Sequence, residues 1–362
     1  MKILFLCGSV ELGSDGVGDY TRRLCGALIQ SGHDVMILSL CDLYIESYAK
    51  EFQNIEGIKV LTERIPLSAG LEERRNWTQN TIDSFQPDWI SLQFVPYSFH
   101  PKGVPYWLPK FLHKLKGTHE WHIMFHELWI GLEKETTYKK KCVGLLQKEI
   151  IRKLAKKVNP KIVHTQAKVY QYYLSTINIR AQYLPLFGNV AVTAAIEKPI
   201  NCMVFVVFAT IHNGAPIEDF IVDLKNTISY EEQTTKFIFV GRNGDELKSW
   251  TASLEKNQIP YDILGSCSEE IISNVLCSSS YGISTTPFKI SDKSGVVAAY
   301  RDHQLPIISI AKPWTDAENI NVEFNDFIEY KGGAIDFLNL SNYKARNLDN
   351  IALEFSQSLI IK

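Results

Sequence analysis

The chain has 362 residues, 45% of them hydrophobic and 22% charged, a balance typical of a globular protein with two domains or one large one. Its formal net charge of −2 gives no general attraction to nucleic acid, so a nucleic-acid-binding function is not expected. The seven cysteines form no CxxC pair, and the first apolar run is too short for a signal peptide. We therefore expect a cytoplasmic protein with reduced thiols.

The chain opens with a βαβ pattern around a glycine-rich loop. Lys2 to Cys7 is a continuous apolar run that predicts a central parallel strand, and residues 17–31 predict an amphipathic helix. The loop between them, GSVELGSDGVG, spaces its glycines too widely, and too far from the strand, for a dinucleotide-binding turn. The N–H groups of Gly16 and Gly18 could still contact a phosphate or a substrate.

Two side chains of the first half lie where α/β sheets bind ligands. Residues 121–127 predict a strand that ends on His126 and Glu127, and open α/β sheets bind ligands at the carboxyl ends of their strands. The histidines on either side of Glu120 would be spread apart by this strand, so no metal site is predicted. Other strands are predicted at 33–40, 58–61, 87–93 and 161–165, and helices at 72–85, 107–115 and from residue 170.

Residues 138–158 predict a long amphipathic helix with eight lysines and arginines against one glutamate. Two interpretations are open. The charges form a solvated face, or the helix lies against an anionic membrane surface or an acidic acceptor. The second interpretation adds a peripheral position at the inner face of the membrane. The expected buried stripe consists of Val143, Leu146, Ile150 and Leu154.

A second α/β pattern follows a change of composition. Residues 188–201 are small and polar and predict a linker. After it, strands are predicted at 203–209, 236–240, 261–264, 281–284 and 305–310, and helices at 216–228, 246–257, 269–277, 295–300, 335–340 and 351–360. Two α/β halves of similar size, each beginning with a buried strand, imply a ligand cleft between them.

A loop in the second half combines positive charge with a helix start. It spans residues 285–293 and carries Lys289 and Lys293, and Ser294 can cap the helix that begins at Gly295. The N–H groups and the positive dipole end at a helix N-terminus suit an anion, most simply a phosphate or diphosphate. The alternative is that the lysines are solvated and Ser294 is only a cap.

Four segments carry a family resemblance. They are GVGDYTRRLCGALIQSGHDV at 16–35, FHELWIG at 125–131, LPLFGNV at 184–190 and FIFVGRNGDEL at 237–247. Together with the loop at 285–293, their order and spacing resemble glycosyltransferase family four, which has the GT-B fold. The resemblance implies two Rossmann-like α/β domains facing a central cleft. They would be an acceptor-binding domain at 1–188, a donor-binding domain at 189–340 and a C-terminal helix at 341–362.

The resemblance also implies a bacterial, hexosyltransferase-like enzyme of polysaccharide biosynthesis. Such an enzyme moves a sugar from a nucleotide-sugar donor to a glycan, lipid-linked or small-molecule acceptor, without metal or cofactor and usually with retention. The donor-binding residues it implies are Gly265 and Ser266 for the base, and Lys289, Lys293, Ser294 and Gly295 for the diphosphate. His126 is the first choice to face the sugar or acceptor, with Asp19 and Glu127 as second choices. Alternatively, His126 is structural, and Asp19 is a first-turn residue favoured by the helix dipole.

The sequence departs from the family pattern in the second half. The usual pair of glutamates should fall within residues 284–299, which contain no glutamate, and Ala299 stands near the ribose-holding position. The usual arginine and lysine early in the second domain are not evident, and His212 is the nearest polar substitute. Two alternatives therefore stay open. One is a non-hydrolysing sugar-nucleotide epimerase, and the other is a protein that binds sugar nucleotides without turnover.

Overall fold

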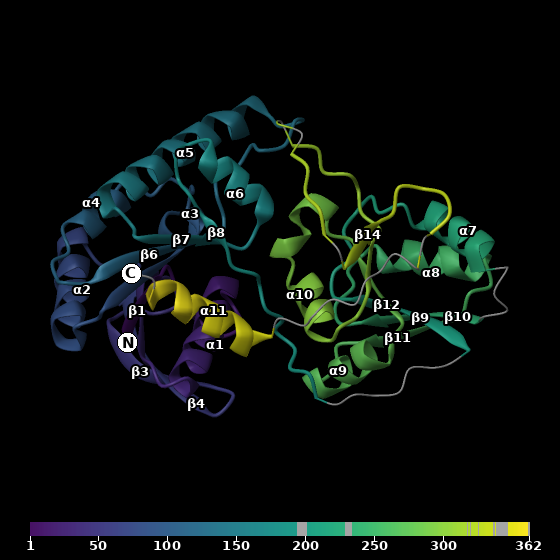
Figure 1. Cartoon of the computed structure of the whole chain (residues 1–362), viewed down its shortest axis with the longest axis horizontal. Helices are drawn as coiled ribbons and strands as arrows, with labels where there is room; N and C mark the ends of the chain where they lie inside the picture. Colours follow the sequence, from purple (N-terminus) through teal and green to yellow (C-terminus); the bar gives the residue numbers. More distant parts are fainter. Residues whose placement is uncertain are drawn as a thin grey trace. The chain divides into compact units, whose positions relative to one another are not determined.

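The computed structural model describes residues 1–193, 201–228, 234–316, 318, 320–324, 326–335, 337 and 347–360. It divides into two units, Met1–Pro185 with Thr315–Asn319 and Leu348–Lys362, and Leu186–Trp314 with Ile320–Asn347. Each unit is a mainly parallel β-sheet covered by helices (Figure 1). The predicted linker at 188–201 and the predicted helix at 335–340 lie partly outside the described residues.

The first unit contains a sheet of eight strands in the order β3-β4-β2-β1-β5-β6-β7-β8. The strands are β1 (Lys2–Cys7), β2 (Asp34–Asp42), β3 (Ala49–Ile55), β4 (Ile58–Pro66), β5 (Trp89–Phe94), β6 (Glu120–Phe125), β7 (Ile162–Thr165) and β8 (Gln182–Tyr183). Every pairing is parallel except β3 with β4. Glu56 and Gly57 join these two strands with φ angles of 51° and 86°, as a two-residue hairpin turn requires. The strand β3 was not predicted from the sequence.

The helices of the first unit are α1 (Gly16–Gln30), α2 (Leu71–Phe85), α3 (Pro96–Phe99), α4 (Leu108–His113), α5 (Tyr138–Val158), α6 (Lys168–Ser175) and α11 (Leu348–Ile360). The bounds predicted for α5 are confirmed, but its predicted stripe is wrong at Leu146, which is 46% exposed. The helix instead turns Gly144 and Gln147 inward. A Cβ at Gly144 would lie 2.1 Å from Ile130 O, and Gln147 Oε1 accepts a hydrogen bond from Ile130 N at 2.9 Å.

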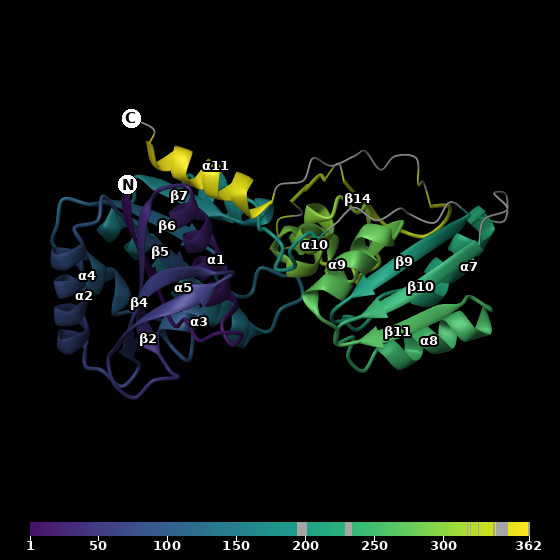
Figure 2. The same cartoon turned by 90° about the horizontal axis from the view of Figure 1, so that it is seen from below.

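One face of the first sheet is covered by α1 and α11. Thr21 of α1 contacts Cys7 of β1, and Phe355 of α11 packs against Phe5 with ring centroids 5.8 Å apart. Figure 2 shows α11 lying along this unit although it is the last helix of the chain. The same face carries buried polar side chains, because residues two apart on a strand share a face: Ser91, Gln93, His122 and His164.

The second unit contains a fully parallel sheet in the order β11-β10-β9-β12-β13-β14. Its strands are β9 (Cys202–Phe208), β10 (Thr234–Val240), β11 (Tyr261–Gly265), β12 (Tyr281–Ser284), β13 (Ile307–Ser309) and β14 (Phe327–Glu329). Its helices are α7 (Ile217–Ile228), α8 (Leu247–Lys256), α9 (Glu269–Ser278) and α10 (Gly295–Asp302). A correction concerns the loop at 285–293, which contains a 3₁₀ helix, η1 (Phe288–Lys293). β14 was not predicted.

Among the described residues, no helix is both long enough and apolar enough to cross a lipid bilayer.

Candidate functional site

The glycine-rich loop after β1 is held by the N-terminal cap of α1. Asp15 is the cap, and its Oδ1 accepts hydrogen bonds from the N–H groups of Val17 and Gly18, each at 2.9 Å. Gly18 also needs its lack of a side chain, because a Cβ there would lie 3.0 Å from Val10 Cα. A Cβ at Gly16 would meet no atom within 4 Å. The Gly18 N–H is therefore already used inside the protein, whereas Gly16 borders open space.

Arg22 and Asp19 anchor the same loop from within α1. Arg22 is fully buried, and its guanidinium donates to Val10 O and to Asp19 Oδ1, and to Gln53 Oε1 at 3.4 Å. Asp19 Oδ1 also accepts a hydrogen bond from Gly13 N at 3.2 Å. Asp19, a predicted catalytic candidate, is thus an ion-pair partner of a buried arginine and a support for the loop.

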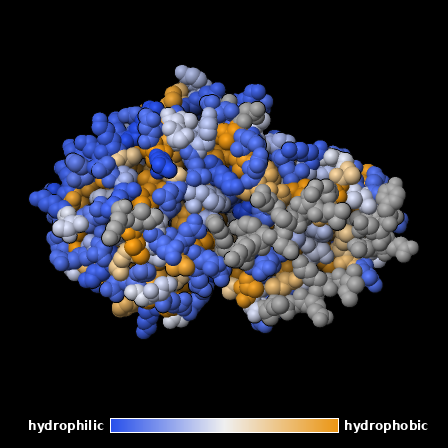
Figure 3. Space-filling view, viewed as in Figure 1, coloured by the Kyte–Doolittle hydropathy of each residue, from blue (hydrophilic) through white to orange (hydrophobic). Residues whose placement is uncertain are grey.

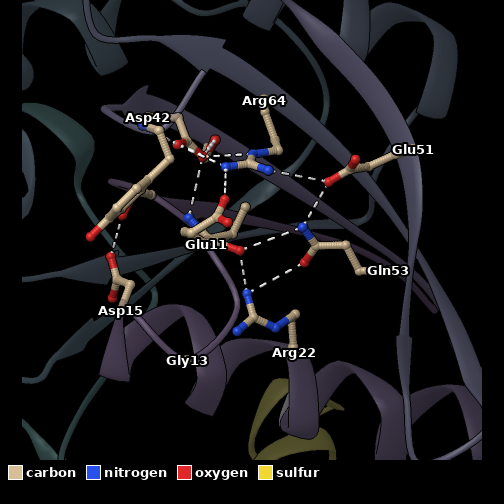
Figure 4. Close-up of polar contacts among 12 residues, drawn as sticks. Glu11, Gly13, Asp15, Arg22, Asp42, Glu51, Gln53 and Arg64 are labelled. Carbon is tan, nitrogen blue, oxygen red and sulfur yellow. Dashed lines mark hydrogen bonds and ion pairs between the residues drawn. The ribbon is translucent and has the colours of Figure 1, made fainter.

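A second arginine braces the loop from β4. Arg64 binds Asp42 through two hydrogen bonds, Nε to Oδ2 at 2.8 Å and Nη2 to Oδ1 at 3.0 Å. It also donates to Glu11 Oε2 at 2.6 Å and lies 3.4 Å from Glu51 Oε1 (Figure 4). Burial opposes the charge of Arg64, but the hydrogen bonds to Asp42 and Glu11 outweigh it and raise the pKa of the guanidinium. Asp42 Oδ2 in turn accepts from Val10 N at 3.4 Å.

His126 lies at the carboxyl edge of the first sheet, one residue after β6. Its side chain is buried, and both ring nitrogens contact glutamine side chains. Nε2 lies 2.8 Å from Gln93 Oε1 and Nδ1 lies 3.1 Å from Gln166 Oε1. The ring of Tyr20 meets the imidazole edge-on with centroids 4.9 Å apart. Glu127 follows in the connecting segment and is half-buried.

The loop between β12 and α10 lies at the carboxyl edge of the second sheet. Ser294 caps α10 as predicted, and its Oγ accepts hydrogen bonds from Val297 N at 3.4 Å and from Thr286 Oγ1 at 3.2 Å. Lys289 and Lys293 lie half-buried on η1, and Gly295 is exposed at the first position of the helix. The lysines and the helix N-terminus predicted to hold an anion therefore belong to one continuous segment.

His212 is brought to this segment by the sheet topology. Strands β9 and β12 are neighbours, so the residues after each strand meet at the same edge. Thr285 Oγ1 accepts a hydrogen bond from His212 N at 2.9 Å and lies 3.0 Å from His212 Nδ1. The imidazole is exposed.

Gly265 and Ser266 lie at the carboxyl edge of the same sheet, three strands away from the loop between β12 and α10. Gly265 ends β11 with a φ angle of 63°, and Ser266 is exposed beyond it. With neighbouring strands about 4.8 Å apart, roughly 14 Å separates them from the β12 loop. That span is compatible with a ligand whose base lies at one end and whose phosphates lie at the other.

Ala299 lies in the core of the second unit. The residue is fully buried, and a Cβ on Gly188 would lie only 2.8 Å from Ala299 Cα. Gly188 N donates to Asp302 Oδ2 at 2.7 Å, which fixes the segment against α10. Position 299 therefore has no room for a ligand-holding carboxylate.

Several residues that organise these edges were missed by the sequence analysis: Glu11, Asp42, Gln53, Arg64, Gln93, Gln166 and Asn243. Most are polar residues near the carboxyl end of a strand, a position that could have marked them. Asn243, for example, follows β10, and its Nδ2 donates to Ala209 O at 2.8 Å. Arg64 gave no signal, because its partners come from three other segments.

The comparisons with known proteins agree with this architecture. No family model matches the chain, and no curated protein matches it. Among solved structures, the chain is similar to the lipopolysaccharide outer core galactosyltransferase WaaB in its apo form, with a TM-score of 0.57, 12% identity and 99% of each chain covered. It is equally similar to Alr3699/HepE of Anabaena in complex with UDP and glucose, with a TM-score of 0.57, 14% identity and 99% of each chain covered.

An epimerase is also similar. The UDP-GlcNAc 2-epimerase of Methanocaldococcus jannaschii has a TM-score of 0.51 and 11% identity, with 99% of this chain and 100% of that chain covered. At these identities the likeness concerns the fold alone. The chain has the GT-B fold, two Rossmann-like α/β domains, which glycosyltransferases and sugar-nucleotide epimerases share.

Proposed function

We propose that the protein is a glycosyltransferase that takes a sugar from a nucleotide-sugar donor. The observation that carries this proposal is the edge of the second sheet, where Lys289, Lys293 and the start of α10 belong to one segment. Cationic side chains and a helix N-terminus stabilise a leaving diphosphate without a metal ion. Gly265 and Ser266 are the proposed contacts for the base. HepE, which has the same fold, is bound to UDP and glucose.

Retention of the anomeric configuration is the proposed stereochemical course. An inverting transfer needs a protein base at the acceptor hydroxyl. Asp19 is paired with Arg22, and both ring nitrogens of His126 contact amide groups. Glu127 is the remaining candidate to contact an acceptor in the first unit. The acceptor we propose is a glycan, a lipid-linked sugar or a small molecule of bacterial polysaccharide synthesis.

A donor panel tests the proposal. The purified protein is incubated with nucleotide sugars of different bases and sugars, with and without candidate acceptors, and nucleoside diphosphate release is measured. Release that depends on the acceptor supports a transferase. A free C2 epimer without acceptor dependence would instead identify an epimerase. Thermal stabilisation by a donor without turnover would identify a binding protein.

We further propose that α5 contacts an anionic membrane surface. Tyr138, Leu145 and Leu146 are 83%, 66% and 46% exposed, and they share the helix with its exposed lysines. Figure 3 shows a predominantly hydrophilic surface over α5, interrupted by small apolar patches. Exposed apolar side chains beside basic ones are the pattern of helices that lie in a membrane interface.

A basic cavity continues this surface at the end of α5. It has a volume of about 730 Å³, and its lining contains four cationic side chains and no acidic one. The cationic residues are Arg152, Lys156, Lys161 and Arg180. Such a cavity suits anionic lipid headgroups.

Flotation with phosphatidylglycerol and phosphatidylcholine vesicles tests the contact. Binding to the anionic vesicles only, weakened by salt and by the double change Leu145→Glu with Leu146→Glu, is expected. The control is Leu353→Glu on α11, where the side chain is 52% exposed. No binding to either vesicle would leave α5 as a solvated face.

A further inference from the structure

A continuous series of buried polar side chains runs from the segment after β7 to β5 and back through β6 to β7. Its members, in order of contact, are Gln166, His126, Gln93, Ser91, His122 and His164. The successive distances are 3.1, 2.8, 2.7, 2.7 and 3.0 Å. None of the six residues is more than 6% exposed. We call this series the polar chain.

Ser91 sets the direction of the hydrogen bonds in the polar chain. Gln93 Nε2 donates to Ser91 Oγ, so the serine hydroxyl must place its own hydrogen elsewhere. Its other contact is His122 Nδ1, which therefore accepts. If Gln93 Nε2 stayed on Ser91 and His122 Nδ1 carried a hydrogen, Ser91 Oγ would receive two hydrogens, and these two contacts would offer no acceptor for its own.

The two interior histidines continue this direction. A neutral His122 that accepts at Nδ1 carries its hydrogen on Nε2, and it donates to His164 Nδ1. Burial lowers the pKa of His122 well below its usual value and the pKa of His164 to about 4, so both rings are neutral at pH 7. Phe355 of α11 covers both rings, with centroids at 5.1 and 6.3 Å.

The other end of the polar chain fixes His126. Gln93 has its Nε2 on Ser91, so its Oε1 faces His126 and accepts from His126 Nε2–H. The amide of Gln166 lies between His126 Nδ1 and the side chain of Tyr20. Burial raises the pKa of Tyr20, so the phenol remains a donor. Gln166 Oε1 faces His126 Nδ1, and the two amide atoms of a glutamine exchange by a half-turn, so the Nε2–H tautomer of His126 requires the Gln166 amide N–H to face Nδ1.

We propose that Ser91, His122 and His164 are positioning residues that hold His126 as the neutral Nε2–H tautomer through Gln93. All the hydrogen bonds from Gln166 to His164 then run in one direction. The amide of Gln93 separates the histidines, so the chain fixes a protonation state and does not conduct a proton. The proposal goes beyond the proposed transferase activity, because it concerns the protein without donor or acceptor.

The side chains that contact His126 determine whether its imidazole is neutral or protonated. Tyr20 faces it from α1, Gln93 from β5 and Gln166 from the segment after β7. The interior histidine His122 also acts on it through the electrostatic coupling of the two rings. None of these four groups is an anion at pH 7, so they supply no charge that would favour an imidazolium.

Nitrogen NMR of the full chain labelled with ¹⁵N-histidine tests the proposal, with the His126 signals assigned by their loss in His126→Gln. The expected wild-type pattern is a neutral Nε2–H imidazole at pH 7. In Ser91→Ala the Gln93 amide loses its acceptor and can turn, so a substantial Nδ1–H population is expected. Ser91→Thr keeps the hydroxyl and should keep the wild-type pattern.

A second variant keeps the test decisive if Ser91→Ala does not fold. Gln93→Glu has the same shape but places a carboxylate on His126 Nε2, which should raise the pKa of His126 by about one to three pH units. A wild-type His126 protonated on both nitrogens at pH 7 would overturn the proposal. So would an unchanged tautomer in a folded Ser91→Ala variant, or an unshifted titration in Gln93→Glu.

Discussion

At the carboxyl edge of the first sheet, His126 is 6% exposed and both its ring nitrogens contact glutamine side chains. At the same edge of the second sheet, His212 is exposed, and a Cβ on Gly295, which opens α10, would meet no atom within 4 Å. The polar groups around His126 at the first edge bind one another, whereas His212 and Gly295 at the second edge border solvent. A solvent-bordered edge with cationic side chains can admit an anion, and buried polar groups that bind one another hold a fixed arrangement.

The buried histidines of the first sheet should make the folded protein less stable in acid. The pKa of His164 is lowered by burial from 6.5 to about 4, with a hydrogen bond to Gln182 acting in the opposite direction. The unfolded chain therefore binds more protons than the folded protein between these values, and stability falls as the pH falls from 6.5 to 4. The expected loss from this residue is about 3 kcal/mol. Urea unfolding at a series of pH values measures it.

Two variants sharpen this result. His164→Phe removes one titrating group and should make the acid limb of the stability curve less steep, although the lowered pKa of His122 still contributes. His113→Gln changes an exposed histidine and should leave the limb in place. An equally steep limb in His164→Phe would show that other groups cause the acid loss.

Replacing Arg22, the buried arginine of α1 that anchors the glycine-rich loop, should cause the next largest loss of stability. Arg22→Met removes three hydrogen bonds, to Val10 O, Gln53 and Asp19, at roughly 1 kcal/mol each, so unfolding should become easier by about 3 kcal/mol. The matched control is Arg23→Met, whose side chain is 15% exposed and pairs with the 56% exposed Glu56, so this variant should cost less than Arg22→Met. Equal losses in the two variants would contradict the bracing role of Arg22.

Changes at the carboxyl edge of the second sheet should alter ligand binding more than stability. Changing both Lys289 and Lys293 to alanine should weaken nucleoside diphosphate binding by about tenfold for each lysine, since 1.4 kcal/mol is tenfold in affinity. Calorimetric titration measures the affinity, and thermal unfolding checks the fold. Lys248→Ala on α8 is the control, because this exposed lysine lies outside the segment. Unchanged affinity in the double variant would remove the proposed diphosphate site.

The smallest expected effect is a difference in stability between alanine substitutions at two glycines in the first turn of α1. Gly18→Ala places a Cβ 3.0 Å from Val10 Cα and should destabilise the protein by about 1–2 kcal/mol. Gly16→Ala meets no atom within 4 Å and should be neutral or stabilising by about 0.5 kcal/mol. A comparison of melting temperatures decides this. The reverse ranking would mean that the loop is not packed against α1.

Much of the architecture was predictable because it depends on local sequence patterns. The apolar run of β1, the periodicity of α5 and the serine cap of α10 each depend on residues that are close in sequence. The hairpin β3–β4 was missed because β3 is mostly exposed and lacks an apolar run. The helix bounds of α5 were predictable, but its buried face was not, because Gly144 sets how closely the helix approaches residue 130.

By itself, the sequence determined the alternation of strands and helices in two α/β halves, the cationic segment before α10 and the position of His126 at the end of a strand. Only the tertiary structure decided that His126 joins a buried polar chain, that Asp19 serves Arg22, and that Ala299 packs against Gly188. The physical reason is distance along the chain. Strand periodicity and helix caps depend on neighbours within a few residues, whereas His126 and Gln93 are 33 positions apart and Gly188 and Asp302 are 114 positions apart. Asp19 and Arg22 are only 3 positions apart, but the fold brings Val10 and Gln53 to the same arginine.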